Sequence, residues 1–389
     1  MRSFWKEIKM KIAHVGLASF YTEGMTYQDN QLAEQNVRDG HEVLYISNAA
    51  KYVNGEVVYT GYEDSVLSSG VRLVRLPYET IVNAYLSDKL RKVKGLYELL
   101  ESFEPDVIFS HALCYLSVFD VIKYKKAHPH VRFYADIHTD EKNSGRNWVS
   151  LNIQHKIIYR YFYQKAYPCL EKFFFISRER KDFAVKYYGL PEDKMEFYPL
   201  GGTILGDVEY EKLRAEGRAE LGATEDELVF IHSGKLDAAK RTEELLRAFA
   251  DVAELKAKLF VCGSIPENME EKLTALFAAD KRVSFLGWKS ATELIKLLCA
   301  CDFYLQPGSQ SATMENALCC RTAVMLYPHK AYTADFDYGN VVWVENEADM
   351  KKVFTAVKNG EISLETLGKI SEKFAGEFLD YRKLAARMY

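Results

Sequence analysis

A short apolar strand followed by small polar residues is the first part of this sequence that suggests chemistry. Phe303–Gln306 is predicted to form the strand, and Ser311 is a candidate N-cap for the helix that follows. Because Ser311, Ala312 and Thr313 have small side chains, we expect the first backbone amides of this helix to face solvent. Unpaired amides and the helix dipole attract anions, so the segment predicts a phosphate site.

Glu315 lies one turn inside the same helix. Its carboxylate could accept hydrogen bonds from vicinal hydroxyl groups of a sugar, and the two features together would suit the ribose and diphosphate of a nucleotide. An ordinary strand-to-helix connection is the alternative, since the helix dipole favours a glutamate in the first turn. This segment alone leaves both interpretations open.

A second predicted strand end combines glycine with positive charge. Gly234 is followed by Lys235, and Lys240 comes just before a predicted helix. Lysines at such a turn can bind a diphosphate as point charges on its oxygens, although lysines beside turns are also common on protein surfaces. Gly263 and Gly287 end two further predicted strands, and several glycine-terminated strand ends on one sheet edge favour a shared binding site.

A third polar strand end lies in the first half of the chain. Asp136 and His138 come at the end of a predicted strand, and Asp140 and Arg146 lie in the loop that follows. These side chains could face a second substrate. A structural histidine followed by a solvated charged loop is the alternative.

Strands and amphipathic helices alternate along almost the whole chain, which indicates an α/β protein with parallel sheets and helices on both faces. The pattern restarts near Gly201–Gly206, where we place the hinge between two doubly wound domains whose strand ends would face one central cleft. The first series of predicted strands comprises 11–17, 42–47, 71–77, 106–111, 132–138, 173–177 and 195–200, and the second comprises 228–233, 257–262, 283–286, 303–306, 323–326 and 341–344.

Composition narrows the class of protein. A chain of 389 residues is too long for one ordinary core, and a net charge of −4 argues against a general nucleic-acid binder. The seven cysteines are scattered and lack zinc-ligand spacing, as expected for buried thiols of a cytoplasmic protein. The basic and apolar beginning is interpreted as a first strand rather than a signal peptide, and no segment is apolar for long enough to predict a transmembrane helix.

With these motifs the sequence resembles the large retaining family of GT-B glycosyltransferases, which includes many bacterial cell-surface polysaccharide enzymes. Gly234–Leu236 with Lys240 is similar to the family's diphosphate-binding motif, with Lys235 in place of an arginine. Residues 283–288 resemble its base-contacting strand end, and residues 300–318 resemble the strand and acidic helix that hold the donor nucleotide. The resemblance covers nearly the whole chain.

The resemblance implies the GT-B fold, with two Rossmann-like domains facing a central cleft. An acceptor-side domain would cover 1–203, a nucleotide-sugar-binding domain 204–372, and a terminal helix over 373–389 would cross back onto the first domain. It also implies a nucleotide-sugar co-substrate carrying UDP or GDP, no cofactor and no metal, because lysines and helix amides neutralise the diphosphate.

The same resemblance assigns roles to individual residues. The expected catalytic residues are His138, Lys235, Lys240 and Glu315, with His138 close to the transferred sugar. The acceptor side would be formed by Asp136, His138, Asp140 and Arg146. The expected donor-binding residues are Gly24, Gly234, Lys235, Lys240, Gly263, Trp288, Ser309, Gln310, Ser311, Ala312, Thr313 and Glu315.

Two departures from the family pattern affect the donor sugar. The family usually has a second glutamate eight positions before the one matched by Glu315, where this chain has Pro307. The contact to the donor sugar is then missing, or it is made by Ser309, Gln310 or Ser311. The loop after the first strand also offers one glycine where many relatives have two.

The resemblance implies a metal-independent, retaining transfer of a sugar to a hydroxyl of a glycan or lipid-linked acceptor, in the cytoplasm. A non-catalytic homologue that binds sugar nucleotides or a partner enzyme is an alternative, and so is a nucleotide-sugar epimerase of the same architecture. Residues 155–175 are basic and aromatic and could lie on the inner face of a membrane. A core-facing helix followed by a buried strand is favoured over that membrane contact.

Overall fold

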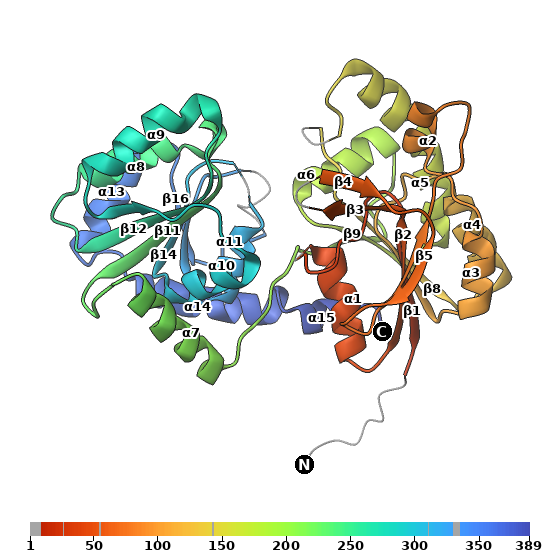
Figure 1. Ribbon diagram of the computed structural model, residues 1–389, viewed down its shortest axis with the longest axis horizontal. Helices are drawn as coiled ribbons and strands as arrows, with labels where there is room; N and C mark the ends of the chain where they lie inside the picture. Colours follow the sequence, from red (N-terminus) through yellow and green to blue (C-terminus); the bar gives the residue numbers. More distant parts are fainter. Residues whose placement is uncertain (1–8, 26, 54–55, 142–143, 310, 330–334) are drawn as a thin grey trace, which may run out of the picture. The chain divides into compact units, whose positions relative to one another are not determined.

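The computed structural model describes residues 9–25, 27–53, 56–141, 144–309, 311–329 and 335–389. The chain forms two compact units, and Figure 1 shows strands at the centre of each unit with helices around them. The first unit comprises Met1–Pro199 and Tyr381–Tyr389, and the second comprises Leu200–Asp380. The division therefore falls four residues before the predicted boundary, and residues 373–380 belong to the second unit instead of a terminal helix on the first.

The first unit contains a sheet in the order β10-β9-β8-β7-β1-β2-β6-β5. All neighbouring strands are parallel except the pair of β5 and β6. All seven predicted strands are present, whereas β5 and a separate hairpin of β3 and β4 were not predicted. The strands are β1 (Lys11–Gly16), β2 (Glu42–Asn48), β3 (Ala50–Val53), β4 (Glu56–Tyr59), β5 (Glu63–Val66), β6 (Arg72–Leu76), β7 (Val107–Ser110), β8 (Arg132–Ile137), β9 (Lys172–Phe175) and β10 (Met195–Phe197).

Helices cover this sheet. The first of them ends at Arg38 with Asp39 as its C-cap, before Gly40, whose φ of 93° places it in the left-handed region that favours glycine. The α-helices are α1 (Gln28–Arg38), α2 (Ala84–Leu90), α3 (Leu96–Phe103), α4 (Val118–Ala127), α5 (Arg160–Ala166), α6 (Arg178–Phe183) and α15 (Tyr381–Ala386). Shorter or wider helical turns are the π-helices η1 (Ser150–Tyr159) and η3 (Ala184–Tyr188) and the 3₁₀ turn η2 (Tyr167–Cys169).

The core of the first unit lies on both faces of the sheet. Strands β1, β7 and β8 are almost entirely buried, as parallel strands covered by helices must be. One apolar cluster joins Phe109 and Phe174 of the sheet to Leu32 of α1 and to Leu384 and Met388. Residues 381–389 are therefore part of the packing of a unit whose other residues end at position 199.

The second unit contains a fully parallel sheet in the order β13-β12-β11-β14-β15-β16, and all six predicted strands are present. These strands are β11 (Leu228–Lys235), β12 (Ala257–Ser264), β13 (Val283–Phe285), β14 (Phe303–Gln306), β15 (Ala323–Leu326) and β16 (Val341–Trp343). Its helices are α7 (Asp207–Glu220), η4 (Ala238–Lys240), α8 (Thr242–Ala250), α9 (Glu267–Ala279), α10 (Ala291–Ala300), α11 (Thr313–Cys319), α13 (Glu347–Lys358) and α14 (Leu364–Phe378).

Each sheet has one point where the order of its strands reverses. In the first unit the chain proceeds from β1 to one side and from β7 to the other, and in the second unit β11 and β14 play the same roles. The crevice beyond the carboxyl ends of such strands is where open α/β sheets bind ligands. None of the helices in the described residues is both long and apolar enough to cross a membrane.

Candidate functional site

Two glycines beside the reversal point of the second sheet, at the ends of β11 and β12, allow these strands to approach each other closely. Gly234 and Gly263 are paired in register, with φ values of 133° and 136°. A Cβ atom on Gly263 would lie 1.8 Å from the carbonyl oxygen of Gly234, which no side chain tolerates. Glycine at this position is therefore a steric requirement of the sheet edge.

Lys240 lies buried between the ends of β11 and β14. Its Nζ donates a hydrogen bond to the carbonyl oxygen of Ser309 at 2.9 Å, and 5% of the residue is exposed. A Cβ atom on Gly234 would lie 2.9 Å from Cε of Lys240, and one on Gly308 would lie 2.2 Å from the carbonyl oxygen of Ala239. The glycines therefore make room for the lysine stem and for the turn that carries it.

Burial lowers the pKa of Lys240 to about 8, while the charge of Asp237 acts in the opposite direction. An anion placed against this ammonium group would restore the charged form, because an opposite charge at short range favours it. Lys235 lies exposed at the end of β11. The structure thus brings the predicted donor residues Gly234, Lys240 and Ser309 together, with Gly263 on the neighbouring strand.

The start of α11 differs from the prediction. The N-cap position is occupied by Ala312, and the helix begins at Thr313 rather than directly after Ser311. The Thr313 amide donates to Oγ of Ser311 at 3.3 Å, and the Met314 amide donates to the Ser311 carbonyl oxygen at 3.2 Å. The predicted free amide of Thr313 therefore has a partner within its own loop, because Ser311 turns back onto it. Gln310 lies outside the described residues.

Glu315 is buried rather than facing solvent. Its Oε2 accepts a hydrogen bond from the Gly201 amide at 2.8 Å, and 5% of the residue is exposed. Burial raises the pKa of Glu315 to about 8, against the opposing effect of the Gly201 and Leu200 amides. The carboxylate that was expected to bind sugar hydroxyls thus anchors the segment that begins the second unit, because an apolar site demands a partner for it.

Two of the predicted donor residues, Trp288 and Gly24, lie far from Lys240 in the sequence. Trp288 follows β13 and is 75% exposed. The carbonyl oxygen of Gly287 accepts a hydrogen bond from the Gly263 amide at 2.9 Å, which ties the Trp288 segment to the end of β12. Gly24 belongs to the first unit, in the loop between β1 and α1, with a φ of 80°.

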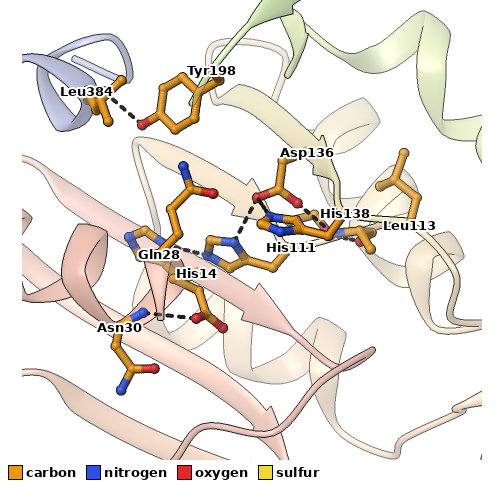
Figure 2. Close-up of polar contacts among 12 residues, drawn as sticks. His14, Gln28, Asn30, His111, Leu113, Asp136, His138, Tyr198 and Leu384 are labelled. Atoms are coloured by element: carbon orange, nitrogen blue, oxygen red, sulfur yellow. Dashed lines mark hydrogen bonds and ion pairs between the residues drawn. The ribbon is translucent and has the colours of Figure 1, made fainter. Parts of the chain in front are cut away.

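Asp136 is the centre of a polar cluster at the reversal point of the first sheet. Its Oδ1 accepts a hydrogen bond from the Ala112 amide at 2.9 Å. Its Oδ2 lies 3.1 Å from Nδ1 of His111 and 3.2 Å from Nε2 of His138. Both rings point toward the carboxylate in Figure 2, so Asp136 and His138 are in direct contact.

The electrostatics of this cluster favour an ionised aspartate. Burial alone would raise the pKa of Asp136, but the charges of His138 and His111 lower it below its usual range. Burial lowers the pKa of His138, yet the carboxylate of Asp136 outweighs this effect and raises it overall. The His138 side chain is 40% exposed, so it can reach a molecule bound at the sheet edge.

The polar cluster continues into the sheet through residues that the sequence did not suggest. Nε2 of His111 lies 3.0 Å from Nδ1 of His14, and Nε2 of His14 lies 2.7 Å from Oδ1 of Asn36. His14 is fully buried in the middle of β1. A histidine inside an otherwise apolar strand was the available signal, because a buried imidazole requires hydrogen-bond partners.

The remaining two predicted acceptor-side residues, Asp140 and Arg146, have different surroundings in the structure. Asp140 forms an ion pair with Arg180 at 2.5 Å, whereas Arg146 is exposed in the following loop. Asp140 therefore has a cationic partner of its own within the first unit. Its carboxylate is engaged with Arg180, and that of Asp136 with two histidines.

Two family models match this chain. The Glycosyltransferase Family 4 model matches residues 24–201, and the model for glycosyl transferases group 1 matches residues 214–373. An uncharacterized glycosyltransferase from Methanocaldococcus jannaschii is 25% identical over 297 residues, which is 73% of this chain and 70% of that protein.

Solved structures share the fold over almost the whole chain. A glycosyltransferase from Rickettsia africae superposes with a TM-score of 0.67 at 13% identity, covering 97% of this chain and 96% of that one. Anabaena HepE in complex with UDP and glucose gives 0.62 at 13% identity, covering 97% and 98%. Sucrose-phosphate synthase from Thermosynechococcus elongatus gives 0.64 at 16% identity, covering 98% and 97%. With one family model on each half and this shared two-domain architecture, the chain belongs to the group 1 glycosyltransferases and has the GT-B fold.

Proposed function

We propose that this glycosyltransferase moves a sugar from a UDP- or GDP-sugar to a hydroxyl group of a glycan or lipid-linked acceptor, with retention and without a metal. The observation that carries the proposal is Lys240, a buried cation held at the reversal point of the second sheet. Its pKa of about 8 makes this position favourable for an anion. The complexes of HepE with UDP and with UDP-glucose support UDP as the nucleotide.

In this proposal the lysines stabilise the leaving group. Negative charge grows on the diphosphate as the glycosidic bond breaks, and Lys240 with Lys235 would offset it without a metal ion. Fixed donors of this kind contribute about 3 kcal/mol each to the transition state. His138 would act on the sugar or the acceptor from the first unit, oriented by Asp136 at 3.2 Å.

Isothermal titration calorimetry with UDP and GDP tests the donor site. Lys240→Met keeps the volume of the side chain and removes its charge, and Lys235→Ala removes the exposed cation. We expect the dissociation constant to rise at least about tenfold for Lys240→Met, with a smaller increase for Lys235→Ala. Lys212→Ala, at an exposed position on α7, is the matched control and should bind as the wild type does. Unchanged affinity in both site variants would refute the assignment.

A transfer assay separates the enzyme from its alternatives. Release of nucleoside diphosphate together with an extended acceptor supports glycosyl transfer, and NMR of the new anomeric centre reports retention or inversion. His138→Ala should abolish most transfer while leaving nucleotide affinity unchanged, and EDTA should leave the rate intact. Nucleotide binding without transfer to any acceptor would favour a non-catalytic homologue. Conversion of the donor sugar without an acceptor would favour an epimerase.

An exposed apolar stripe on η1 and α5 supports a membrane-linked acceptor. The predicted core-facing helix accounts for one face of this segment, on which Tyr159 and Phe162 are buried as expected. On the opposite face Val149, Ile153, Ile157 and Tyr161 recur every four residues with exposures of 53%, 40%, 63% and 53%, and neighbouring Trp148 is 70% exposed. Four residues are close to one full turn both of an α-helix and of the wider π-helix η1, so these side chains, from Val149 at the N-cap of η1 onward, lie on one side, unlike scattered surface hydrophobics.

The charge of this segment is complementary to an anionic lipid surface. Arg146, Lys156, Arg160 and Lys165 lie between residues 144 and 166, with no aspartate or glutamate among them, in a chain whose net charge is −4. An amphipathic helix with basic residues and exposed Trp and Ile lies in the interface of a bilayer, and each cation adds about 1 kcal/mol of attraction. We place the enzyme at the inner face of the membrane, where its seven free cysteines would remain reduced.

Vesicle flotation tests the membrane contact. The protein should float with phosphatidylglycerol-containing vesicles and not with pure phosphatidylcholine, and emission from Trp148 should shift to shorter wavelength. Ile153→Glu with Ile157→Glu should reduce binding at least about tenfold. Val208→Glu introduces a single glutamate at an apolar residue of the second unit that is 87% exposed, and it should bind normally. Equal binding by the two charge variants would contradict the proposal.

A further inference from the structure

The polar cluster around Asp136 extends to Tyr389, which follows α15. Beyond His14, Nδ2 of Asn36 donates a hydrogen bond to the Tyr389 hydroxyl at 2.7 Å. The same hydroxyl donates to Oδ2 of Asp39 at 2.8 Å. His14 and Asn36 are fully buried. Seven side chains, which lie in or shortly after α1, α15, β1, β7 and β8, thus form one continuous chain of hydrogen bonds, from Asp39 to His138.

The direction of each bond follows from its neighbour, starting at Asp39. An ionised carboxylate only accepts, so the single proton of the Tyr389 hydroxyl points to Asp39 and its oxygen accepts from Nδ2 of Asn36. Oδ1 of Asn36 therefore faces His14 and accepts from its Nε2.

The direction continues from His14 to Asp136. Burial is the main cause that lowers the pKa of His14 to about 3, so this ring is neutral and its Nδ1 has a lone pair. His111 must donate to that lone pair from Nε2. Its Nδ1 faces the carboxylate of Asp136, which also accepts. Both nitrogens of His111 therefore face acceptors and both carry protons.

We propose that Tyr389 is a positioning residue, which fixes the direction of this chain and thereby keeps His111 doubly protonated between His14 and Asp136. Without the tyrosine hydroxyl, the Asn36 amide can turn and present Nδ2 to His14. His14 then moves its proton to Nδ1, and His111 must accept at Nε2 and keep a single proton on Nδ1. One proton leaves His111 to solvent in this change.

The consequence for His138 is electrostatic. Loss of the positive charge on His111 leaves the Asp136 carboxylate compensated by His138 alone. We therefore expect the titration midpoint of His138 to rise by on the order of one pH unit. The shift of His138 matters for function only through the role proposed above for His138 in sugar transfer. The protonation state of His111 does not depend on that role.

Other charged and titratable groups surround the chain and stay the same in the variants below. The Tyr45 ring stacks 5.9 Å from both His14 and His111, and its hydroxyl donates to Asp29. Asp29 and Arg180 act on His138 with opposite signs. The His41 ring lies 4.3 Å from the ring of Tyr389.

Nitrogen-15 NMR of the imidazole rings in the full chain at pH 7 tests the proposal without any substrate. The wild type should show two protonated nitrogens on His111, and Tyr389→Phe should show one. Tyr198→Phe is the matched control, because it removes a buried hydrogen bond to Leu384 at the same packing interface without touching the chain. If loosening of α15 were the cause, this control would reproduce the effect.

Asp39→Asn provides a second variant at a half-buried position, in case Tyr389→Phe unfolds the unit. An amide at position 39 no longer fixes the hydroxyl proton of Tyr389, so a fraction of His111 should lose its second proton. A singly protonated His111 in the wild type, or a doubly protonated one in Tyr389→Phe, would overturn the proposal. Failure of glycosyl transfer would leave these NMR results unaffected, so the two proposals can fail separately.

Discussion

Burial in the second unit shifts the pKa values of Glu315 and Lys240, two side chains of opposite charge, toward the same value. The pKa of each is about 8, raised for the carboxyl and lowered for the ammonium group. In both cases the larger cause is the loss of water around the charged form. Both residues therefore change charge near neutral pH, where a nucleotide would bind.

Glu315 should make the stability of the second unit depend on pH. Its folded pKa of about 8 lies above the ordinary value of 4.5. The folded state therefore holds a proton that the unfolded chain has lost, and this stabilisation is full below about pH 4.5 and lost as the pH rises through 8. We expect the free energy of unfolding, relative to Glu315→Gln, to fall by about 1.4 kcal/mol per pH unit within that window. Urea denaturation at pH 5, 6, 7 and 8 measures the slope.

Lys240 affects the pH dependence of the unfolding free energy in the opposite direction, and only above about pH 8. Its folded pKa is lowered from 10.5 to about 8, so its effect on the pH dependence falls between these values and is common to both proteins. Parallel curves for wild type and Glu315→Gln between pH 5 and 8 would show that the carboxyl is not buried as described.

Gly263 and Gly287 form a matched pair for testing the close approach of strands. Both have positive φ, but a Cβ atom on Gly263 would lie 1.8 Å from a carbonyl oxygen, whereas one on Gly287 has no neighbour within 4 Å. We expect Gly263→Ala to cost about 3 kcal/mol or more of unfolding free energy, and Gly287→Ala about 1 kcal/mol. Similar losses from both substitutions would mean that backbone conformation, and not contact, requires glycine at position 263.

Part of each site could be predicted from the sequence, because the residues concerned lie close together in the chain or directly after neighbouring strands. Asp136 and His138 lie two residues apart at one strand end, and Lys240 with Ser309 follow strands that flank a reversal point. The link from His111 to His14 joins residues 97 positions apart, and only the strand order places them in contact. The partner of Glu315 was missed for the same reason, because Gly201 lies 114 residues away.

At the scale of elements, the alternation of apolar strands and amphipathic helices was sufficient to find all thirteen strands of the two parallel series. Strand β5 was missed because its residues are mostly exposed and polar, and β4 was missed because it is only four residues long and exposed on both faces, so neither shows the pattern of a buried strand. The terminal helix was placed too early, since the buried face of α14 belongs to the second unit and α15 starts only at Tyr381.

Helix α15 is held by both apolar and polar contacts. Met388 and Leu384 are buried in the cluster that contains Phe174. The Arg387 guanidinium donates to the Phe197 carbonyl oxygen at 2.8 Å and lies 4.7 Å from the centre of the Tyr198 ring. This short element is therefore a structural part of the first unit.

Truncation of Met388, a buried side chain two residues after the end of α15, should destabilise the first unit. We expect Met388→Ala to lower the unfolding free energy by about 2–5 kcal/mol, because it leaves a cavity in the apolar cluster. Lys383→Ala, at an exposed position of α15, should change it by less than about 0.5 kcal/mol. Equal effects of the two changes in chemical denaturation would show that α15 does not pack as described.

At the scale of the molecule, the second unit is continuous in sequence and the first is not. The apolar cluster of the second unit is formed only by residues between 228 and 367. The first unit takes side chains from both sides of that insertion. The two units should therefore differ in whether they fold as isolated fragments.

A fragment of residues 200–380 should fold alone and bind the same nucleotide as the full chain. Lys240, Ser309 and Glu315 with its partner Gly201 all lie within it. Residues 9–199 without 381–389 should show lower stability or a loss of cooperative unfolding, and adding the peptide 381–389 should restore part of it. Circular dichroism melts and calorimetry with UDP measure both outcomes, and an unfolded 200–380 fragment would contradict this division of the chain.

The discontinuity of the first unit also has a consequence during translation. Residues 1–199 leave the ribosome first, but residues 381–389 follow only after the 181 residues of Leu200–Asp380. At about 5–20 residues per second this interval lasts roughly 10–40 seconds. During that time the apolar surface formed by Phe109, Phe174 and Leu32 is not yet covered by Leu384 and Met388. The residues that form the apolar cluster of the second unit have by then all been synthesised. The half of the protein that is synthesised later is thus the half that completes its folding first.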